Sequence, residues 1–287
     1  MRTRNLGVVL LAGAVLIGLA ACGSDSDSSG STTTAGGATT TGAALPFTPI
    51  EADTLTVVTS LPGPGFWNGT DPAEITGGLE YEMAKALQAK LGLANLKVRN
   101  ENFDSIVTGA VKDYDIALSQ VTITDERAKV VDFSQPYFES QQGILTRAGT
   151  AVTNLEEARA LKWAVQTGTT GELLINDTLK PSTEAQPFQD LSAAFAALSA
   201  GQVDAVAMDT AIVLGQAASS DGKLDVPAQF TQPGGPDKYG AIYPKGSPNK
   251  ATFDAYIESF VADGSLAGWQ EQWLTKSPAD LTTITIE

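Results

Sequence analysis

The chain has 287 residues and a formal net charge of −15, from 33 acidic and 18 basic side chains. So acidic a chain is expected to repel nucleic acid and anionic lipid headgroups rather than bind them. It contains no histidine and a single cysteine. A Ser-His-Asp triad, a Cys-His dyad, a histidine-ligated zinc site and an internal disulfide are therefore all excluded.

The N-terminus has the pattern of a secretory signal peptide over residues 1–21. Arg2 and Arg4 precede an apolar run at 6–19, which is short for a membrane-spanning helix. A transmembrane anchor is the alternative interpretation. The run ends in the letters LAAC, which resemble a bacterial lipobox, and this resemblance implies cleavage before Cys22 and attachment of lipid to its sulfur. The alternative is that Cys22 is a chance residue at the end of a cleaved signal.

Residues 22–49 are expected to form a flexible tether behind that anchor. From Gly23 to Ala44 the sequence consists almost entirely of Ser, Thr, Gly, Ala and Asp, and it holds no aromatic residue. Such a composition cannot bury enough apolar surface to order itself. The tether would keep the folded part outside the cell, near the membrane but free to rotate.

The rest of the chain alternates between short apolar runs typical of strands and longer segments with helical spacing of apolar residues. This alternation predicts βαβ units, the α/β class and a largely parallel sheet. One set of elements ends before residue 150 and another begins after it, so we expect two lobes. In chain order, the expected elements are strand 55–58, helix 79–91, strand 96–98, helix 103–111, strand 115–118, helix 154–159 capped by Asn154, strand 162–165, a helix opened by 168–174, helix 191–200, strand 203–208, a helix from 210, strand 239–243 and helices 251–261 and 266–274.

Polar and aromatic residues follow the expected strands at their carboxyl ends, where open α/β sheets bind ligands. Arg127 offers a planar fork suited to a carboxylate, and Asp209 is an acceptor for an ammonium group. The turn at 168–171 opens a helix whose amides favour an anion. With flat aromatic surface, these groups match the α-carboxylate, α-amino group and side chain of an amino acid. The candidate ligand-binding residues are Ser60, Phe66, Phe103, Ser119, Gln120, Thr122, Arg127, Thr169, Thr170 and Asp209.

Each candidate also has a purely structural interpretation. Arg127 could be a solvated helix charge among its acidic neighbours, and Asp209 could cap the helix that follows it. The phenylalanines could belong to the core, the hydroxyls could bond nearby backbone, and 168–171 could be an ordinary strand-to-helix turn. What favours the ligand-binding interpretation is that all the candidates fall at the same ends of the strands.

Four motifs carry a resemblance to a known family. They are TITDER at 122–127, VDFSQPYF at 131–138, VQTGTTG at 165–171 and VDAV at 203–206 followed by Asp209. With these motifs the chain resembles family 3 of the bacterial extracellular solute-binding proteins, which bind polar amino acids. The resemblance implies a two-lobed periplasmic-binding-protein fold of type II, with each lobe a mostly parallel sheet flanked by helices. Lobe one is expected over 50–139 and 238–287 and lobe two over 142–229, with hinge crossings near 139–141 and 230–237.

By the same resemblance, Thr122, Arg127 and a threonine of the second-lobe turn bind the α-carboxylate, Asp209 binds the α-amino group, and Phe103 is an aromatic platform. The family implies the permease subunits of an ABC importer as partners, a monomer, no cofactor and no catalysis. Many members carry an acid and an aromatic where Ser60 and Gly63 stand here. We therefore lean toward an amide or acidic amino acid as ligand rather than a basic one, but the sequence shows no evident basic residue for a side-chain carboxylate, and the side-chain preference stays open.

Two other functions stay open. A dehydratase of binding-protein descent, acting on a cyclic carboxylate, would need a general acid in the cleft, for which Glu101 and Glu139 lie nearest to the motifs. A surface sensor or adhesin could keep the fold and lose ligand binding, although the nearly complete set of candidates argues against it.

Overall fold

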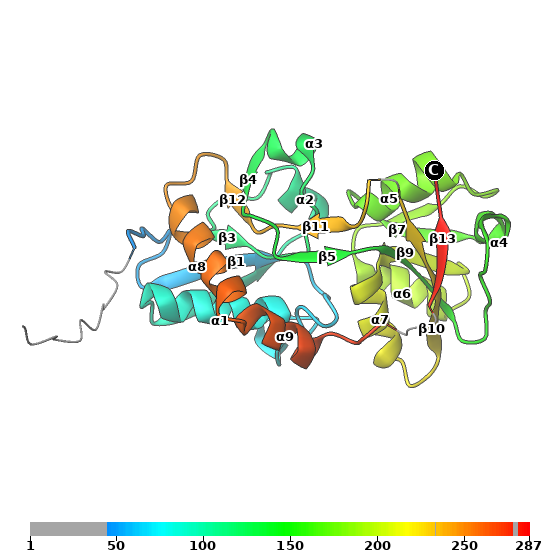
Figure 1. Ribbon diagram of the computed structural model, residues 1–287, viewed down its shortest axis with the longest axis horizontal. Coiled ribbons are helices and arrows are strands. Elements are labelled where there is room, and N and C mark those ends of the chain that lie inside the picture. The colour runs from blue at the N-terminus through cyan, green and yellow to red at the C-terminus, as the bar shows by residue number, and fades with distance from the viewer. Residues whose placement is uncertain (1–44, 233, 278–280) are drawn as a thin grey trace, which may run out of the picture. The chain divides into compact units, whose positions relative to one another are not determined.

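The computed structural model describes residues 45–232, 234–277 and 281–287. The predicted signal peptide, the lipidation site Cys22 and most of the predicted tether lie outside these residues. The described residues form two lobes, each a β-sheet with helices packed against it (Figure 1). Within them, no helix combines the length and the hydropathy that crossing a membrane requires.

The first lobe is built on a five-stranded sheet in the order β2-β1-β3-β12-β4. Its strands are β1 (Thr54–Thr59), β2 (Asn95–Asn100), β3 (Ile116–Ala117), β4 (Val131–Phe133) and β12 (Ile242–Pro244). Its helices are η1 (Pro72–Glu74), α1 (Leu79–Leu91), α2 (Phe103–Val107), α3 (Asp125–Ala128), α8 (Lys250–Ala262) and α9 (Ser265–Trp273).

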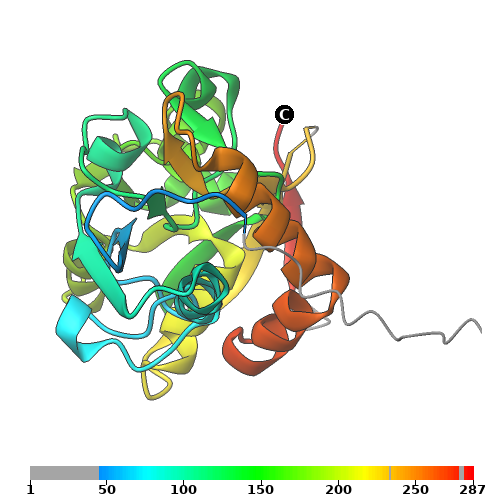
Figure 2. The ribbon, with the colours of Figure 1, turned by 90° about the vertical axis from the view of Figure 1, so that its left-hand side faces the viewer.

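Strand β1 is buried along its whole length, because helices cover both faces of the sheet. Leu55 and Val57 point into the cluster that also contains apolar residues of α1 and α8, whereas Val58 points into the cluster formed with α2. Seen from the end of this lobe, α8 and α9 lie along one side of it (Figure 2). The loops that leave β1 and β3 at their carboxyl ends thus start from a rigid platform.

The second lobe is built on a six-stranded sheet in the order β13-β10-β6-β9-β7-β8. Its strands are β6 (Gln142–Arg147), β7 (Trp163–Gln166), β8 (Gln186–Phe188), β9 (Ala205–Asp209), β10 (Leu224–Thr231) and β13 (Thr282–Thr285). Its helices are α4 (Leu155–Ala160), α5 (Thr170–Leu173), the π-helix η2 (Leu174–Leu179), α6 (Leu191–Ser199) and α7 (Thr210–Ala218). Strands β7 and β9 are buried throughout, which positions the residues after them firmly.

Two antiparallel strands connect the lobes, β5 (Phe138–Ser140) and β11 (Asp237–Tyr239). They lie side by side between the two large sheets (Figure 1). Strand β5 leads into β6 of the second lobe, and β11 follows β10 and leads back to β12 of the first. The chain crosses between the lobes through β5 and through β11, and it crosses again between α9 of the first lobe and β13 (Thr282–Thr285) of the second.

Each sheet is mostly parallel, as expected, with one strand that runs against all the others. In the first sheet β1 is parallel to β2 and β3, whereas β12 runs antiparallel to β3 and β4. In the second, β7 is parallel to β8 and β9, whereas β6 runs antiparallel to β9 and β10. The antiparallel strands are those that adjoin the hinge, because the chain reverses its direction there.

Both ends of the described chain differ from the expected boundaries. Strand β13 pairs in parallel with β10, so the C-terminal strand belongs to the second sheet and not to lobe one. At the other end, residues 46–49 are docked on lobe one rather than part of a tether. Thr48 exchanges two hydrogen bonds with the Asn249 side chain, and Phe47 packs edge-on against Phe253.

Candidate functional site

Arg127 lies between the two lobes. Its backbone N–H donates to the hydroxyl of Thr124, which caps α3. The side chain is 9% exposed: Nη1 donates to the Thr122 carbonyl at 2.6 Å, and Nη2 donates across the lobes to the Gly168 carbonyl at 2.8 Å. The guanidinium carbon lies 5.4 Å from the centre of the Phe103 ring. So buried a side chain is not a solvated helix charge.

The charge of Arg127 is poorly hydrated. Burial lowers its pKa to about 10, while the nearby carboxylates of Asp209 and Asp237 favour the charged form. Because neither carboxylate accepts a hydrogen bond from the guanidinium among its described contacts, a further anion would find a partner there.

Asp209 ends β9 and is 3% exposed. Although it stands at the N-cap position of α7, its side chain makes no capping hydrogen bond. Its Oδ1 instead accepts from Gln142 Nε2 at 3.0 Å. Burial and the charge of Asp237 raise the pKa of Asp209 well above its usual range, although Tyr239 and Arg127 favour the charged form. The helix-cap interpretation of Asp209 therefore does not hold.

The two threonines of the second-lobe turn have different surroundings. The hydroxyl of Thr169 accepts from the Glu172 N–H and donates to the Gln166 carbonyl, so Thr169 caps α5. The Gly168 N–H already donates to the Glu172 carboxylate at 2.8 Å, which occupies one amide that we expected to receive an anion. Thr170 instead donates from its hydroxyl to Asp237 at 3.0 Å and thereby faces the acidic residues.

The loop after β3 is tied to the loop after β1. Ser119 Oγ accepts from the Ser60 N–H at 2.9 Å. Gln120 has a φ of +51° and donates from both its backbone and its side chain to the buried carboxylate of Glu80. Thr122 is 6% exposed, pairs with Tyr239 and gives its carbonyl to Arg127. These contacts fix the two loops to each other and to α1 of lobe one.

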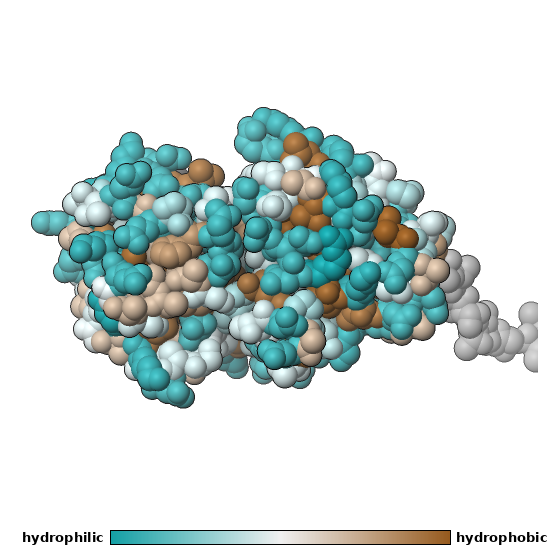
Figure 3. Space-filling model, turned by 180° about the vertical axis from the view of Figure 1, so that it is seen from behind, coloured by the Kyte–Doolittle hydropathy of each residue, from teal (hydrophilic) through white to brown (hydrophobic). Residues whose placement is uncertain are grey.

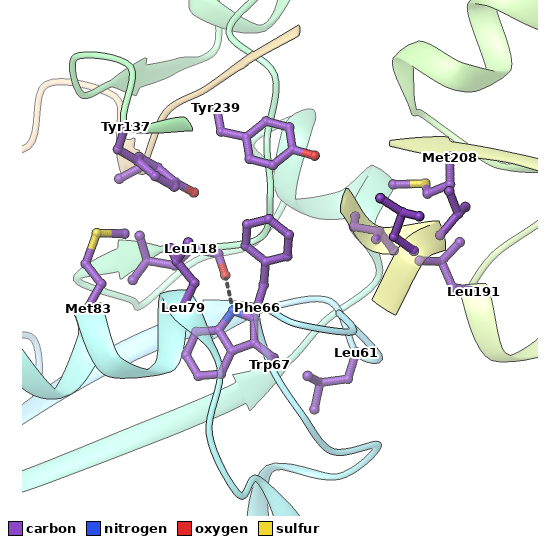
Figure 4. Close-up of a cluster of buried hydrophobic side chains, with 14 of the residues drawn as sticks. Leu61, Phe66, Trp67, Leu79, Met83, Leu118, Tyr137, Leu191, Met208 and Tyr239 are labelled. Carbon is purple, nitrogen blue, oxygen red and sulfur yellow. Dashed lines mark hydrogen bonds between the residues drawn. The ribbon is translucent and has the colours of Figure 1, made fainter. Parts of the chain in front are cut away.

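The two aromatic candidates, Phe103 and Phe66, lie in different surroundings. The Arg127 guanidinium lies over the ring of Phe103, which places this ring beside the region between the lobes. Phe66 is fully buried and packs against Phe138 and Tyr239 of the hinge strands, with ring centres 5.4 and 5.8 Å apart. Figure 4 shows its ring beside that of Tyr239 and above Trp67, whose Nε1 donates to the Leu118 carbonyl. Phe66 thus supports the hinge from within the core.

Sequence reasoning missed three polar residues. Gln142 and Asp237 lie on the hinge side of the site, each beside a crossing, and Gln142 Nε2 donates to both Asp237 and Asp209. Glu80 is a buried carboxyl in α1 that also accepts from Trp67 and Tyr137. For Asp237, a signal existed in its charge and its position at a crossing. Glu80 stands among apolar helix residues, and nothing in its spacing distinguishes it from a surface acid.

Two glycines let the lobes approach closely on opposite sides of the site. A Cβ atom at Gly168, whose φ is +83°, would lie 3.0 Å from Asp104 Oδ1, and one at Gly215 of α7 would lie 3.0 Å from Pro64 Cβ. A pocket of 360 Å³ opens beside Arg127 and is lined from both lobes, by Asp104 and Leu173 among others. Viewed from behind, a hollow marks the boundary of the two lobes (Figure 3).

The two acids considered for a dehydratase lie apart from this group. Glu101 is paired with Arg99 at 2.5 Å, in a polar pocket of 330 Å³ that also contains Ser60 and Asp190. Glu139 lies 3.6 Å from Lys238 on the hinge strands, and both side chains are 55% exposed. Neither acid contacts Arg127 among the described interactions.

Two sheet-based lobes, joined by a pair of hinge strands with buried charged groups between them, define the periplasmic-binding-protein fold of type II. Solved structures agree. An ancestral arginine-binding protein bound to glutamine is 28% identical, with a TM-score of 0.68 over 78% of this chain and 98% of that one. The arginine-, lysine-, histidine-binding protein ArtJ from Geobacillus stearothermophilus is also 28% identical, with a TM-score of 0.67 over 79% and 97%.

The chain belongs to the bacterial extracellular solute-binding proteins, family 3, whose model matches residues 55–276. Among curated relatives, the ABC transporter glutamine-binding protein GlnH of Bacillus subtilis is 30% identical over 170 residues. That alignment covers 58% of this chain and spans 60% of the length of GlnH.

Proposed function

We propose that this chain is the extracytoplasmic substrate-binding component of an amino-acid ABC importer. The observation that carries the proposal is the placement of Arg127, which contacts both lobes and lies over the Phe103 ring, with the buried Asp209 and the half-buried Asp237 close enough to raise its pKa. A buried cation opposite carboxylates is complementary to a zwitterion.

An amino acid would complete the hydrogen bonds of this site. Its α-carboxylate would pair with Arg127 and its α-ammonium with Asp209, while its side chain would extend along Phe103. Hydrogen bonds to charged groups contribute about 1.5–3 kcal/mol each, and a micromolar dissociation constant requires about 8 kcal/mol. Three or four such contacts are therefore sufficient, once the cost of closing the lobes is met.

Closure would come from contacts that exist only when the lobes meet. Arg127 belongs to lobe one, and its partner Gly168 and the acid Asp209 belong to lobe two. A ligand held by both lobes favours the closed arrangement, because only that arrangement makes all of its contacts. The permease could then distinguish loaded from empty protein by the arrangement of the lobes.

The cellular setting forms part of the proposal. The lipobox-like ending at Cys22 supports a lipid anchor on the outer face of the cell membrane, and the permease subunits of an ABC importer would be the partners. A single chain supplies both halves of the site, so a monomer suffices.

A thermal-shift screen of the purified protein against the twenty amino acids tests the proposal, followed by calorimetry on those that raise the melting temperature. Arg127→Ala should nearly abolish binding. Lys129→Ala is the matched control, because it removes a cation whose side chain is 64% exposed and which pairs only with its neighbour Glu126 among the described contacts. Binding by no amino acid, or equal binding by both variants, would refute the proposal.

A further inference from the structure

Two acids share one amide group at the hinge side of the site. Gln142 Nε2 donates to Asp209 Oδ1 at 3.0 Å and to Asp237 Oδ2 at 2.6 Å, so these two oxygens lie within about 5.6 Å of each other. The hydroxyl of Thr170 donates to the same oxygen of Asp237 at 3.0 Å. One acid comes from a strand of lobe two and the other from hinge strand β11.

The surrounding charges do not balance this pair. Arg127 directs its guanidinium to the carbonyls of Thr122 and Gly168, and only its longer-range field reaches the two acids. Lys238, which follows Asp237, pairs with Glu139 on the neighbouring hinge strand. If a bound amino acid gives its carboxylate to Arg127 and its ammonium to Asp209, the charge of Asp237 is left over.

One buried polar atom in this cluster, Gln142 Oε1, lacks a hydrogen-bond partner within the described part of the chain, and its residue is 1% exposed. The fully buried hydroxyl of Tyr239 faces Asp209 and favours the charged form of that acid. A Cβ atom at Gly171 would lie 2.8 Å from the Gln142 amide oxygen, so glycine leaves the space it occupies. In Figure 4 the Tyr239 hydroxyl points toward the strand that carries Met208, the neighbour of Asp209.

Buried polar atoms are normally paired, so Gln142 Oε1 marks a hydrogen bond that a ligand can complete. An ammonium group carries three N–H donors, and the cluster offers it the oxygens of Asp209, Asp237 and Gln142. One carboxylate alone would leave part of this capacity unused.

We propose that Asp237 is a second acid of the ammonium subsite, an inference that rests on the function proposed above. The two acids would select amino acids with neutral or positively charged side chains over acidic ones. A ligand with an acidic side chain would add a third carboxylate to a site that already holds one in excess between the buried Asp209 and the half-buried Asp237, and like charges repel more strongly there than in open water.

Proton release accompanies this arrangement. Burial and the neighbouring acid raise the pKa of Asp209, whereas an ammonium bound to its carboxylate would favour the charged form, so binding would release any proton that this carboxyl group holds. Affinity should therefore fall as the pH falls through that raised pKa. The chain has no histidine, so no imidazole contributes to proton release between about pH 5 and pH 7. The groups that face Asp209 are Asp237 and Tyr239 on β11, Gln142 on β6, Thr170 on α5 and Arg127 on α3.

The test is calorimetry of the purified protein with L-glutamine, L-glutamate and L-arginine, in two buffers of different ionisation enthalpy at about pH 6. We expect glutamine and arginine to bind at least about tenfold more tightly than glutamate, with release of a fraction of a proton or more. Asp237→Asn, which keeps the size and the acceptor oxygen, should reduce the preference for glutamine over glutamate by about fivefold or more. Glu126→Gln removes the same charge from a side chain that is 81% exposed and should leave the preference unchanged.

The outcomes separate this inference from the proposed function. Equal binding of glutamine and glutamate, or an unchanged preference in Asp237→Asn, would overturn the two-acid subsite while leaving amino-acid binding intact. If no amino acid binds at all, the proposed function itself fails, and the inference fails with it.

Discussion

Replacing Gly215 by alanine should separate the stability of the protein from its affinity for ligand. Gly215 lies inside α7 of lobe two, directly against Pro64 of lobe one. An added Cβ would lie 3.0 Å from Pro64 Cβ and 3.1 Å from the Pro64 carbonyl carbon and oxygen. These distances are shorter than the usual carbon–carbon contact of about 3.5–4.0 Å. The added methyl group therefore disfavours the arrangement in which the lobes meet and does not affect an arrangement in which they are apart.

The expected magnitudes follow from two opposing effects. Alanine in place of glycine inside a helix contributes about 1 kcal/mol to stability, and this gain is present whether the lobes are open or closed. Overpacking at a tight contact costs about 1–3 kcal/mol. Since only the closed form meets Pro64, ligand affinity should fall roughly 5- to 150-fold. The empty protein should meanwhile unfold at an equal or higher urea concentration.

Calorimetry with the tightest-binding amino acid and urea unfolding without ligand measure the two effects. Gly268→Ala is the matched control: it is also a helix-interior glycine, in α9, and an added Cβ there meets nothing within 4 Å. The control should gain stability and keep its affinity. If Gly215→Ala binds as tightly as the unaltered protein, or if both variants lose affinity equally, closure against Pro64 is not what the ligand drives.

Three further variants test other contacts. Arg127→Lys keeps the charge, but an ammonium group cannot donate to both carbonyls and also lie flat on Phe103. Calorimetry should therefore show roughly 10- to 150-fold weaker ligand binding, and undiminished affinity would show that the planar guanidinium is not needed. Glu80→Gln turns an amide toward buried donors and should cost about 1–3 kcal/mol in urea unfolding, with the surface change Glu82→Gln as control. Because burial raises the pKa of Glu80, the folded state binds its proton more tightly than the unfolded state does. The free energy of unfolding of the unaltered protein should therefore fall as the pH rises from about 4.5 through the raised pKa. The Glu80→Gln variant should lack this pH dependence, and an equal dependence in both proteins would contradict the assignment. Asn249→Ala removes both bonds to Thr48 and should lower the free energy of unfolding by about 1–2 kcal/mol; an unshifted urea midpoint would show that the docked segment 46–49 adds no stability.

Local patterns predicted the elements well where the chain determines them by itself. Helix α1 has the predicted bounds, since its apolar spacing ends at Gly92, whose φ of +70° closes the helix. Asn154 caps α4 as expected, through its bond to the Glu157 N–H. Helix α2 stops at Val107, four residues before the predicted end, and Gly109 follows with a φ of +68°. Val111 continues the apolar spacing of the helix beyond Gly109, so the pattern of apolar residues does not show that the helix has ended.

Features that depend on distant partners were beyond sequence reasoning. The direction of β12 and the pairing of β13 with β10 depend on which strands meet in space. At the site, Arg127 and Asp209 were found because their charges suit a zwitterion. Gln142 was not, since a neutral amide beside a crossing has no such signature, and its importance appears only when one nitrogen is seen to contact two acids.

The docking of the described chain ends on different lobes has a practical consequence. Residues 46–49 are fixed to α8 of lobe one, whereas β13 is fixed to the sheet of lobe two (Figure 1). Fluorophores attached at Leu45, which is 39% exposed, and at the exposed Glu287 would thus ride on opposite halves of the molecule. Energy transfer between these two dyes would report the opening and closing of the lobes directly, and no residue of the site would have to be changed.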